Sequence, residues 1–239
     1  MDIDHDDSLD IQVRPAIDLV RRTALLAVIA ERGVLEIDAE RGDYERDTDR
    51  FELLSWARGA LAGPVTGEEL RLLATPIGEL GDDLSRCDDA LTGAATIAWA
   101  LGIVDSDRLP VPPDGDAEER VMTWAPAPWT DLDRIARKLQ LRSEAAIATE
   151  RERWELWYWR STDADEATGS VDDVVADLAE SGLIPTADGD FATDAAEPFE
   201  KLTPEQQDEI AWLAEHRLRA LNWACGFGDD WESVPLYPD

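Results

Sequence analysis

The chain has 239 residues, and its 54 acidic side chains against 22 basic ones give a formal net charge of −32. A hydrophobic content of 44% is enough for a buried core and excludes a disordered acidic tail. Two distant cysteines, Cys87 and Cys225, exclude a disulfide scaffold, and with only two histidines we expect no metal site and no cofactor. The longest apolar runs are too short to cross a bilayer and the acidic start is unlike a signal peptide, so we expect a cytoplasmic protein without membrane contact.

The basic residues are unusual in kind, because lysine occurs only at Lys138 and Lys201 and the other 20 are arginine. A charge of −32 repels itself in ordinary salt, whereas at about 1 M salt the screening length falls to about 3 Å. The composition therefore predicts a halophilic protein of the haloarchaeal type. A nucleic-acid partner is not expected, because phosphate binding needs clustered cations.

Helical spacing dominates the first half of the chain. Residues 1–12 are expected to form a flexible acidic N-terminus, followed by a helical domain over residues 13–235. Expected helices run from Pro15 to a stop at Gly33, from Thr48 to Leu61, from a Thr66/Glu69 capping box to Pro76, and from Ser85 to Gly102.

Residues 105–130 are rich in proline and tryptophan, and we expect them to form a loop without regular structure. Further helices are expected from Thr130, from Ser143 to Ser161, from Ser170 to Gly182, and from the Thr203/Gln206 capping box to Gly226. A D-G pair within residues 183–193 indicates a small hairpin. The predicted fold is all-α, a single globular domain of seven to eight helices with a Pro-rich central loop.

The last expected helix carries two stripes of side chains. Its core face runs from Ile210 to Cys225 and includes Arg217, which must reach outward or pair with a carboxylate. The opposite stripe holds Trp212, His216, Arg219 and Trp223. We therefore expect other parts of the protein or a partner to pack against both sides of this helix.

The helix after Ser143 places Glu152 among apolar residues on one of its sides, so Glu152 is a candidate buried partner of Arg217. One interpretation is a polar pair in a tryptophan-walled pocket with a ligand nearby. The alternative is a structural ion pair that orients two core helices. His216 has the same two interpretations, as an acid–base or stacking group, or as a packed side chain.

Several short segments resemble the domain of unknown function 4272 family over roughly residues 14–235. The most specific is R-A-L-N-W-x-x-G, which ends at Gly226, and W-A-L-G at Trp99–Gly102 is a weaker one. The resemblance implies a helical structure without an established activity, and it marks the candidate pocket positions Glu152, Trp159, Arg217, Asn222, Trp223 and Trp231. This chain departs from the family pattern at Leu156, Tyr158 and His216, and residues 164–202 resemble an insertion.

Three functions remain open. The first is an interaction or accessory role with a protein partner, through the Trp212/His216/Trp223 stripe and residues 105–130. The second is an enzyme or small-ligand-binding protein whose pocket holds Glu152, Arg217, His216 and Asn222. The third is an acidic inhibitor of a nucleic-acid enzyme. The sequence names no catalytic residue and no oligomeric state.

Overall fold

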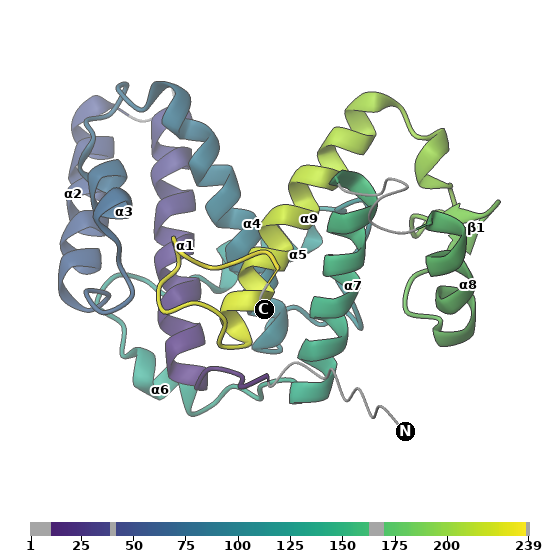
Figure 1. Ribbon diagram of the computed structural model, residues 1–239. Coiled ribbons are helices and arrows are strands. Elements are labelled where there is room, and N and C mark those ends of the chain that lie inside the picture. Colours follow the sequence, from purple (N-terminus) through teal and green to yellow (C-terminus); the bar gives the residue numbers. More distant parts are fainter. Residues whose placement is uncertain (1–10, 39–41, 163–169, 238–239) are drawn as a thin grey trace.

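A computed structural model describes residues 11–38, 42–162 and 170–237, and it shows an almost entirely helical molecule (Figure 1). The α-helices are α1 (Ala16–Ile37), α2 (Asp43–Gly59), α3 (Gly67–Ala74), α4 (Ser85–Ala100), α5 (Asp116–Trp124), α6 (Leu132–Ala136), α7 (Glu144–Thr162), α8 (Val171–Ser181) and α9 (Pro204–Ala224). Two 3-10 turns, η1 (Gly81–Leu84) and η2 (Phe199–Lys201), and two short strands, β1 (Thr186–Ala187) and β2 (Asp190–Phe191), complete the described elements. The all-α prediction is confirmed.

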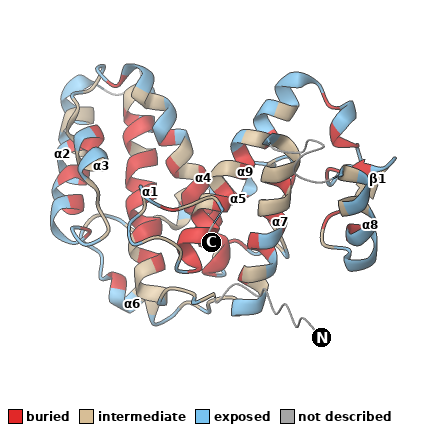
Figure 2. Cartoon of the chain, viewed as in Figure 1, coloured by how far each residue is buried: buried red, intermediate tan, exposed pale blue. Residues whose placement is uncertain are grey.

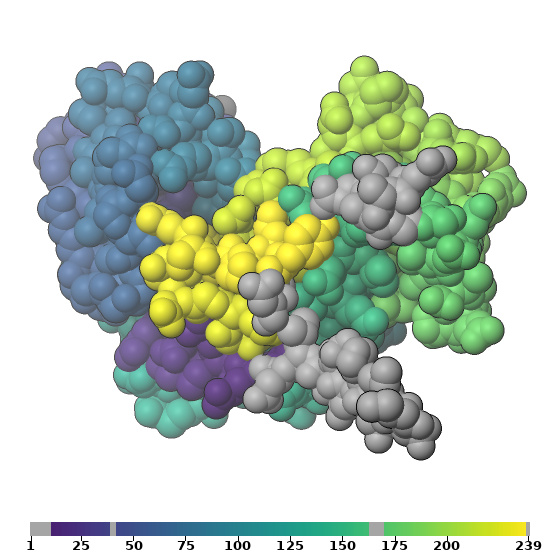
Figure 3. All heavy atoms as spheres, viewed as in Figure 1, coloured from purple at the N-terminus to yellow at the C-terminus, as the bar shows by residue number. Residues whose placement is uncertain are grey.

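Helices α1, α4 and α9 form the centre of the fold, where α1 packs on α4, α4 on α9, and α9 on α7. Their buried residues are mostly apolar and face one another in the middle of the molecule (Figure 2). The N-terminal ends of α4 and α9 diverge (Figure 1), and the space-filling view shows a notch between the α1–α4 side and the N-terminal half of α9 (Figure 3). None of the described helices is both long and apolar enough to span a membrane.

Local signals predicted several helix starts correctly. Thr66 and Glu69 form the predicted capping box at α3, and Thr203 and Gln206 form the one at α9. The predicted hairpin is present, with Thr186 paired to Phe191 across its turn. These features depend on neighbouring residues alone, which is why the sequence is sufficient to predict them.

Four boundary predictions were wrong. Helix α2 begins at Asp43, five residues before the expected start at Thr48. Helix α1 continues past Gly33 to Ile37, because Gly33 serves packing: a Cβ built there would lie 2.6 Å from the Cβ of Cys87 on α4. Residues 105–130 contain α5, whose nine residues lack proline. Asp131 rather than Thr130 caps α6, since its side chain accepts a hydrogen bond from the backbone of Arg134 at 3.0 Å. Residues 1–10 of the predicted flexible N-terminus lie outside the described residues.

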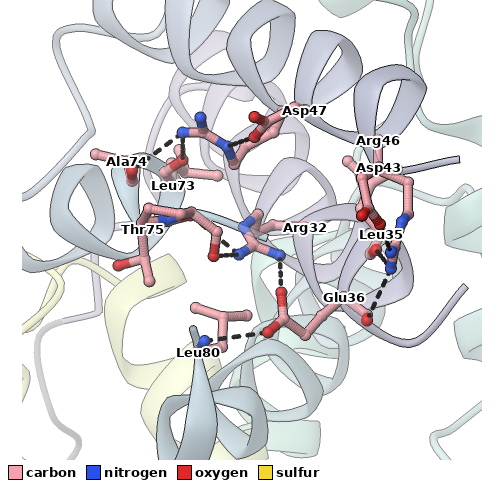
Figure 4. A network of polar contacts seen from close by, with 12 residues as sticks. Arg32, Leu35, Glu36, Asp43, Arg46, Asp47, Leu73, Ala74, Thr75 and Leu80 are labelled. Atoms are coloured by element: carbon pink, nitrogen blue, oxygen red, sulfur yellow. Dashed lines mark hydrogen bonds and ion pairs between the residues drawn. The ribbon is translucent and has the colours of Figure 1, made fainter. Parts of the chain in front are cut away.

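Buried arginines cap the C-terminal ends of helices by donating hydrogen bonds to backbone carbonyl groups (Figure 4). Arg32 donates to the carbonyl of Thr75 at 3.0 Å and pairs with Glu36 at 2.8 Å, while Arg50 donates to the carbonyl of Ala74 at 3.0 Å. The guanidinium group satisfies several acceptors at once, which lysine does less well. The core therefore uses arginine as a structural residue.

Candidate functional site

The predicted partnership of Glu152 with Arg217 is wrong, because Glu152 is exposed on α7. The buried acid is Glu150, which accepts hydrogen bonds from the backbone of Leu109 at 3.0 Å, from Arg153 at 2.6 Å and from the indole of Trp154 at 2.8 Å. Two residues along a helix correspond to about 200° of rotation, which is enough to exchange the interior for solvent. The indole donor of Trp154, four residues after Glu150, is the signal that could have identified the correct acid.

Arg217 is buried at 1% exposure and lies against the same cluster. It donates to the carbonyl of Pro110 at 2.7 Å, and its guanidinium carbon lies 4.6 Å from the ring centre of Trp154. Burial lowers the pKa of Arg217 to about 10, which still leaves it charged at neutral pH. Glu150, Arg153 and Arg217 thus join α7 and α9 to residues 109–110, and we interpret them as a structural cluster.

Asn222 is fully buried on α9 and holds two other parts of the chain. Its side-chain oxygen accepts from Arg151 of α7 at 2.7 Å, and its amide donates to the carbonyls of Pro235 at 2.7 Å and Leu236 at 3.0 Å. It therefore fixes the segment that follows α9. Trp159 packs on Phe191 of the hairpin, with ring centres 6.2 Å apart, and lies away from these groups.

A cavity of about 430 Å³ opens on the other side of α9. Its apolar floor comes from α1, α3 and α4, and its walls come from α9 and the segment after it. In Figure 3 this region lies where the blue helices α3 and α4 meet the yellow C-terminal segment, below the notch. We call it the α4–α9 cavity. Its floor residues are Leu26, Ile29, Leu72, Ala90 and Gly93.

His216 lines the α4–α9 cavity together with Asp89 of α4. The Nε2 atom of His216 lies 3.3 Å from Asp89 Oδ1, which also accepts a hydrogen bond from the indole of Trp212 at 3.0 Å. Burial lowers the pKa of His216 below its ordinary value, although the charge of Asp89 acts in the opposite direction. Burial therefore favours the neutral form of His216, which is held beside a carboxylate.

Trp231 forms a wall of the cavity and is fixed on several sides. The guanidinium carbon of Arg22 lies 4.1 Å from its ring centre, and the ring of Trp223 meets it at 5.8 Å, edge to face. Arg22 is buried and pairs with Glu69 of α3. A Cβ at Gly93 would lie 3.3 Å from the Trp231 ring, so the glycine gives the indole its place.

The charged groups of the cavity come from three helices and from the segment after α9. Arg219 of α9 donates to Glu215 at 2.9 Å, and Arg86 of α4 donates to Glu68 of α3 at 3.4 Å. Glu232, from the segment after α9, also lines the cavity. Among the residues that the structure describes, no group of His, Cys, Asp and Glu is arranged to hold a metal ion.

The comparison with known families decides the chain's membership. A family model for a domain of unknown function (DUF4272) matches residues 5–179. The chain belongs to the DUF4272 family. The cavity of this DUF4272 chain combines α1, α3 and α4 from within the matched range with α9 and Trp231 from beyond it. No curated protein and no solved structure matches the chain.

The structure divides the predicted pocket residues into two groups. His216, Arg219 and Trp231 line the α4–α9 cavity, and Trp223 packs behind Trp231. Arg217 and Asn222 lie elsewhere in the interior, Trp159 is partly buried, and Glu152 faces solvent. Four charged residues of the lining, Glu68, Arg86, Asp89 and Glu232, were not predicted from the sequence. Three of them are on α3 and α4, and only tertiary packing brings these helices to the cavity.

Proposed function

We propose that this protein binds a small molecule in the α4–α9 cavity. The observation that carries the proposal is a cavity of about 430 Å³ that combines an apolar floor, a fixed tryptophan wall and groups of both charges. Small-ligand sites are typically about 300–1,000 Å³, mostly apolar, with a few polar groups that orient the ligand. The α4–α9 cavity has a volume within that range and an apolar floor, and its titratable lining residues make it more polar than most such sites.

The residue types that line the cavity favour ligand binding over covalent catalysis. Its described residues include no serine, threonine, cysteine or lysine that could attack a substrate. Neutral His216, held beside Asp89, has the form of a general base, so acid–base chemistry on a bound ligand is the enzymatic version of this proposal.

The test is a fragment screen on protein labelled with 5-fluorotryptophan and observed by fluorine NMR. The Trp231→Phe variant identifies the Trp231 resonance, and Trp129, which lies against Gly59 of α2, supplies a control resonance. Fragments that shift Trp231 and leave Trp129 unchanged support the proposal. A broad library that shifts neither resonance contradicts it.

A protein partner at the notch is the second candidate, and the observation that favours it is Trp212. This side chain is 37% exposed at the notch, with its indole bonded to Asp89. The candidate predicts that a partner cross-linked near Trp212 is lost in the Trp212→Ala variant, measured by quantitative cross-linking mass spectrometry. Equal cross-linking in both proteins contradicts it.

We also propose that the acidic surface is an adaptation to a salt-rich cytoplasm. Exposed carboxylates occur on α2, α5, α8 and α9 alike, which favours general solvation over an inhibitor with one acidic face. The melting temperature should rise from about 0.1 M to about 1 M KCl as repulsion is screened. A melting temperature that is highest at low salt would count against this adaptation.

A further inference from the structure

The guanidinium groups in the α4–α9 cavity retain free hydrogen-bond donors. Arg219 uses only its Nη2 atom, in the bond to Glu215, and its other nitrogens have no acceptor among the described residues. Arg86 reaches Glu68 at 3.4 Å and Asp83 at 3.7 Å, both long contacts. Arginine matches carboxylate geometry through two parallel bonds. The two side chains can therefore accept an anionic group from a ligand.

Most carboxylates of the cavity are already occupied by protein groups. Glu69 binds Arg22 and the backbone of Thr66, and Asp89 binds Trp212 and His216. Glu232 differs, because its carboxylate makes no hydrogen bond to any residue that the structure describes, and only its charge acts on the buried Arg22. It can therefore accept a cationic group from a ligand.

The apolar floor lines the same cavity as these charged groups. Leu26, Ile29 and Leu72 form it, with the ring of Trp231 at its side. Arg22 and Trp223 hold that ring in place, so it offers a prepared surface to an apolar body.

We propose that the α4–α9 cavity binds a zwitterion with an apolar side chain, the chemistry of a free apolar amino acid. Its carboxylate would lie on Arg219 and Arg86, its ammonium group on Glu232, and its side chain on the floor beside Trp231. This inference rests on the proposed function and names its ligand class. A ligand with a single charge lacks one of the two partners and faces unscreened groups of its own sign.

The experiment uses three probes that share one ring. L-phenylalanine carries both charges, phenylacetate only the negative one, and 2-phenylethylamine only the positive one. Each is titrated into the full-length protein labelled with 5-fluorotryptophan, and the Trp231 resonance is followed. We expect L-phenylalanine to bind at least about tenfold more tightly than either single-charge probe, because each of those probes lacks one charged hydrogen bond.

Matched variants assign the contacts. Arg219→Gln and Glu232→Gln should each weaken L-phenylalanine binding about tenfold, whereas Arg137→Gln and Glu152→Gln, at exposed positions outside the cavity, should leave it unchanged. Glu232→Gln should leave phenylacetate binding unweakened, which a general structural effect would not produce.

Two outcomes overturn the inference. If phenylacetate or 2-phenylethylamine binds as tightly as L-phenylalanine, the ligand class is wrong while the proposed function stands. If none of the three probes shifts Trp231, the zwitterion proposal fails, and the fragment screen decides the proposed function separately.

Discussion

The two sides of α9 use the same residue type in opposite ways. Arg217 is buried, bonded to the carbonyl of Pro110 and packed on Trp154. Arg219, two residues later, lines a cavity and keeps free donors. The guanidinium group of Arg217 is enclosed by the fold, with its Nη2 atom buried without a hydrogen-bond partner among the described residues, while that of Arg219 faces a cavity that a ligand can enter. A polar residue on a core helix is therefore a candidate for function when a ligand can reach its unoccupied hydrogen-bonding groups.

The largest effect on stability should come from substitutions on the interior side of α9. Arg217→Ala should lower the free energy of unfolding by about 2–5 kcal/mol, because it leaves a cavity where the buried side chain packed on Trp154. Arg217→Met keeps most of the packing volume and should cost clearly less. Urea denaturation in about 1 M KCl measures both. Variants that unfold like wild type would mean that Arg217 is not in the core.

Glu150 and Glu152 provide a matched pair of substitutions that tests the interior side of α9, where Glu150 belongs to the structural cluster. Glu150→Gln should cost about 2–3 kcal/mol, since it leaves Arg153 without its charged partner in the interior. Glu152→Gln should change stability by less than about 0.5 kcal/mol, because the side chain is exposed. The reverse ranking, measured by the same denaturation, would restore Glu152 as the buried acid.

His216 gives the cavity side a dependence on pH. Its folded pKa is lowered by burial, so the unfolded chain binds a proton first as the pH falls. The stability that neutral His216 contributes is complete above the unfolded pKa of about 6.5 and is lost as the pH drops toward the folded value. Wild type should therefore lose more stability than His216→Gln between about pH 8 and pH 5. Parallel losses in urea titrations would contradict the shift.

The smallest effect on stability should come from Arg219→Gln. Arg219 is half-buried, with one bond to Glu215, so its loss should cost less than about 1 kcal/mol. The melting temperature checks this value. A cost as large as that of Arg217→Ala would show that Arg219 is structural too.

Much of the fold followed from local residue patterns, but the site did not. Capping boxes at Thr66 and Thr203 act over three residues, so the sequence was sufficient to place α3 and α9. Gly33 resembled a helix stop in the local sequence, because the residue that it packs against, Cys87, is 54 positions away along the chain. The stripe with His216 and Arg219 was visible in the sequence, but its partners Asp89 and Glu232 come from other elements. Tertiary packing decides which polar groups meet, and residue patterns within a short stretch of sequence do not predict that packing.

The central claim is that α9 separates a structural cluster from a ligand site, and one paired measurement tests it most directly. Arg217→Met and Arg219→Gln are compared for melting temperature and for the affinity of the fragment that shifts Trp231 most. We expect Arg217→Met to lower the melting temperature and keep the affinity, and Arg219→Gln to keep the melting temperature and lose affinity. If both variants lose stability and affinity in the same proportion, the two sides of α9 are one structural unit and the claim is wrong.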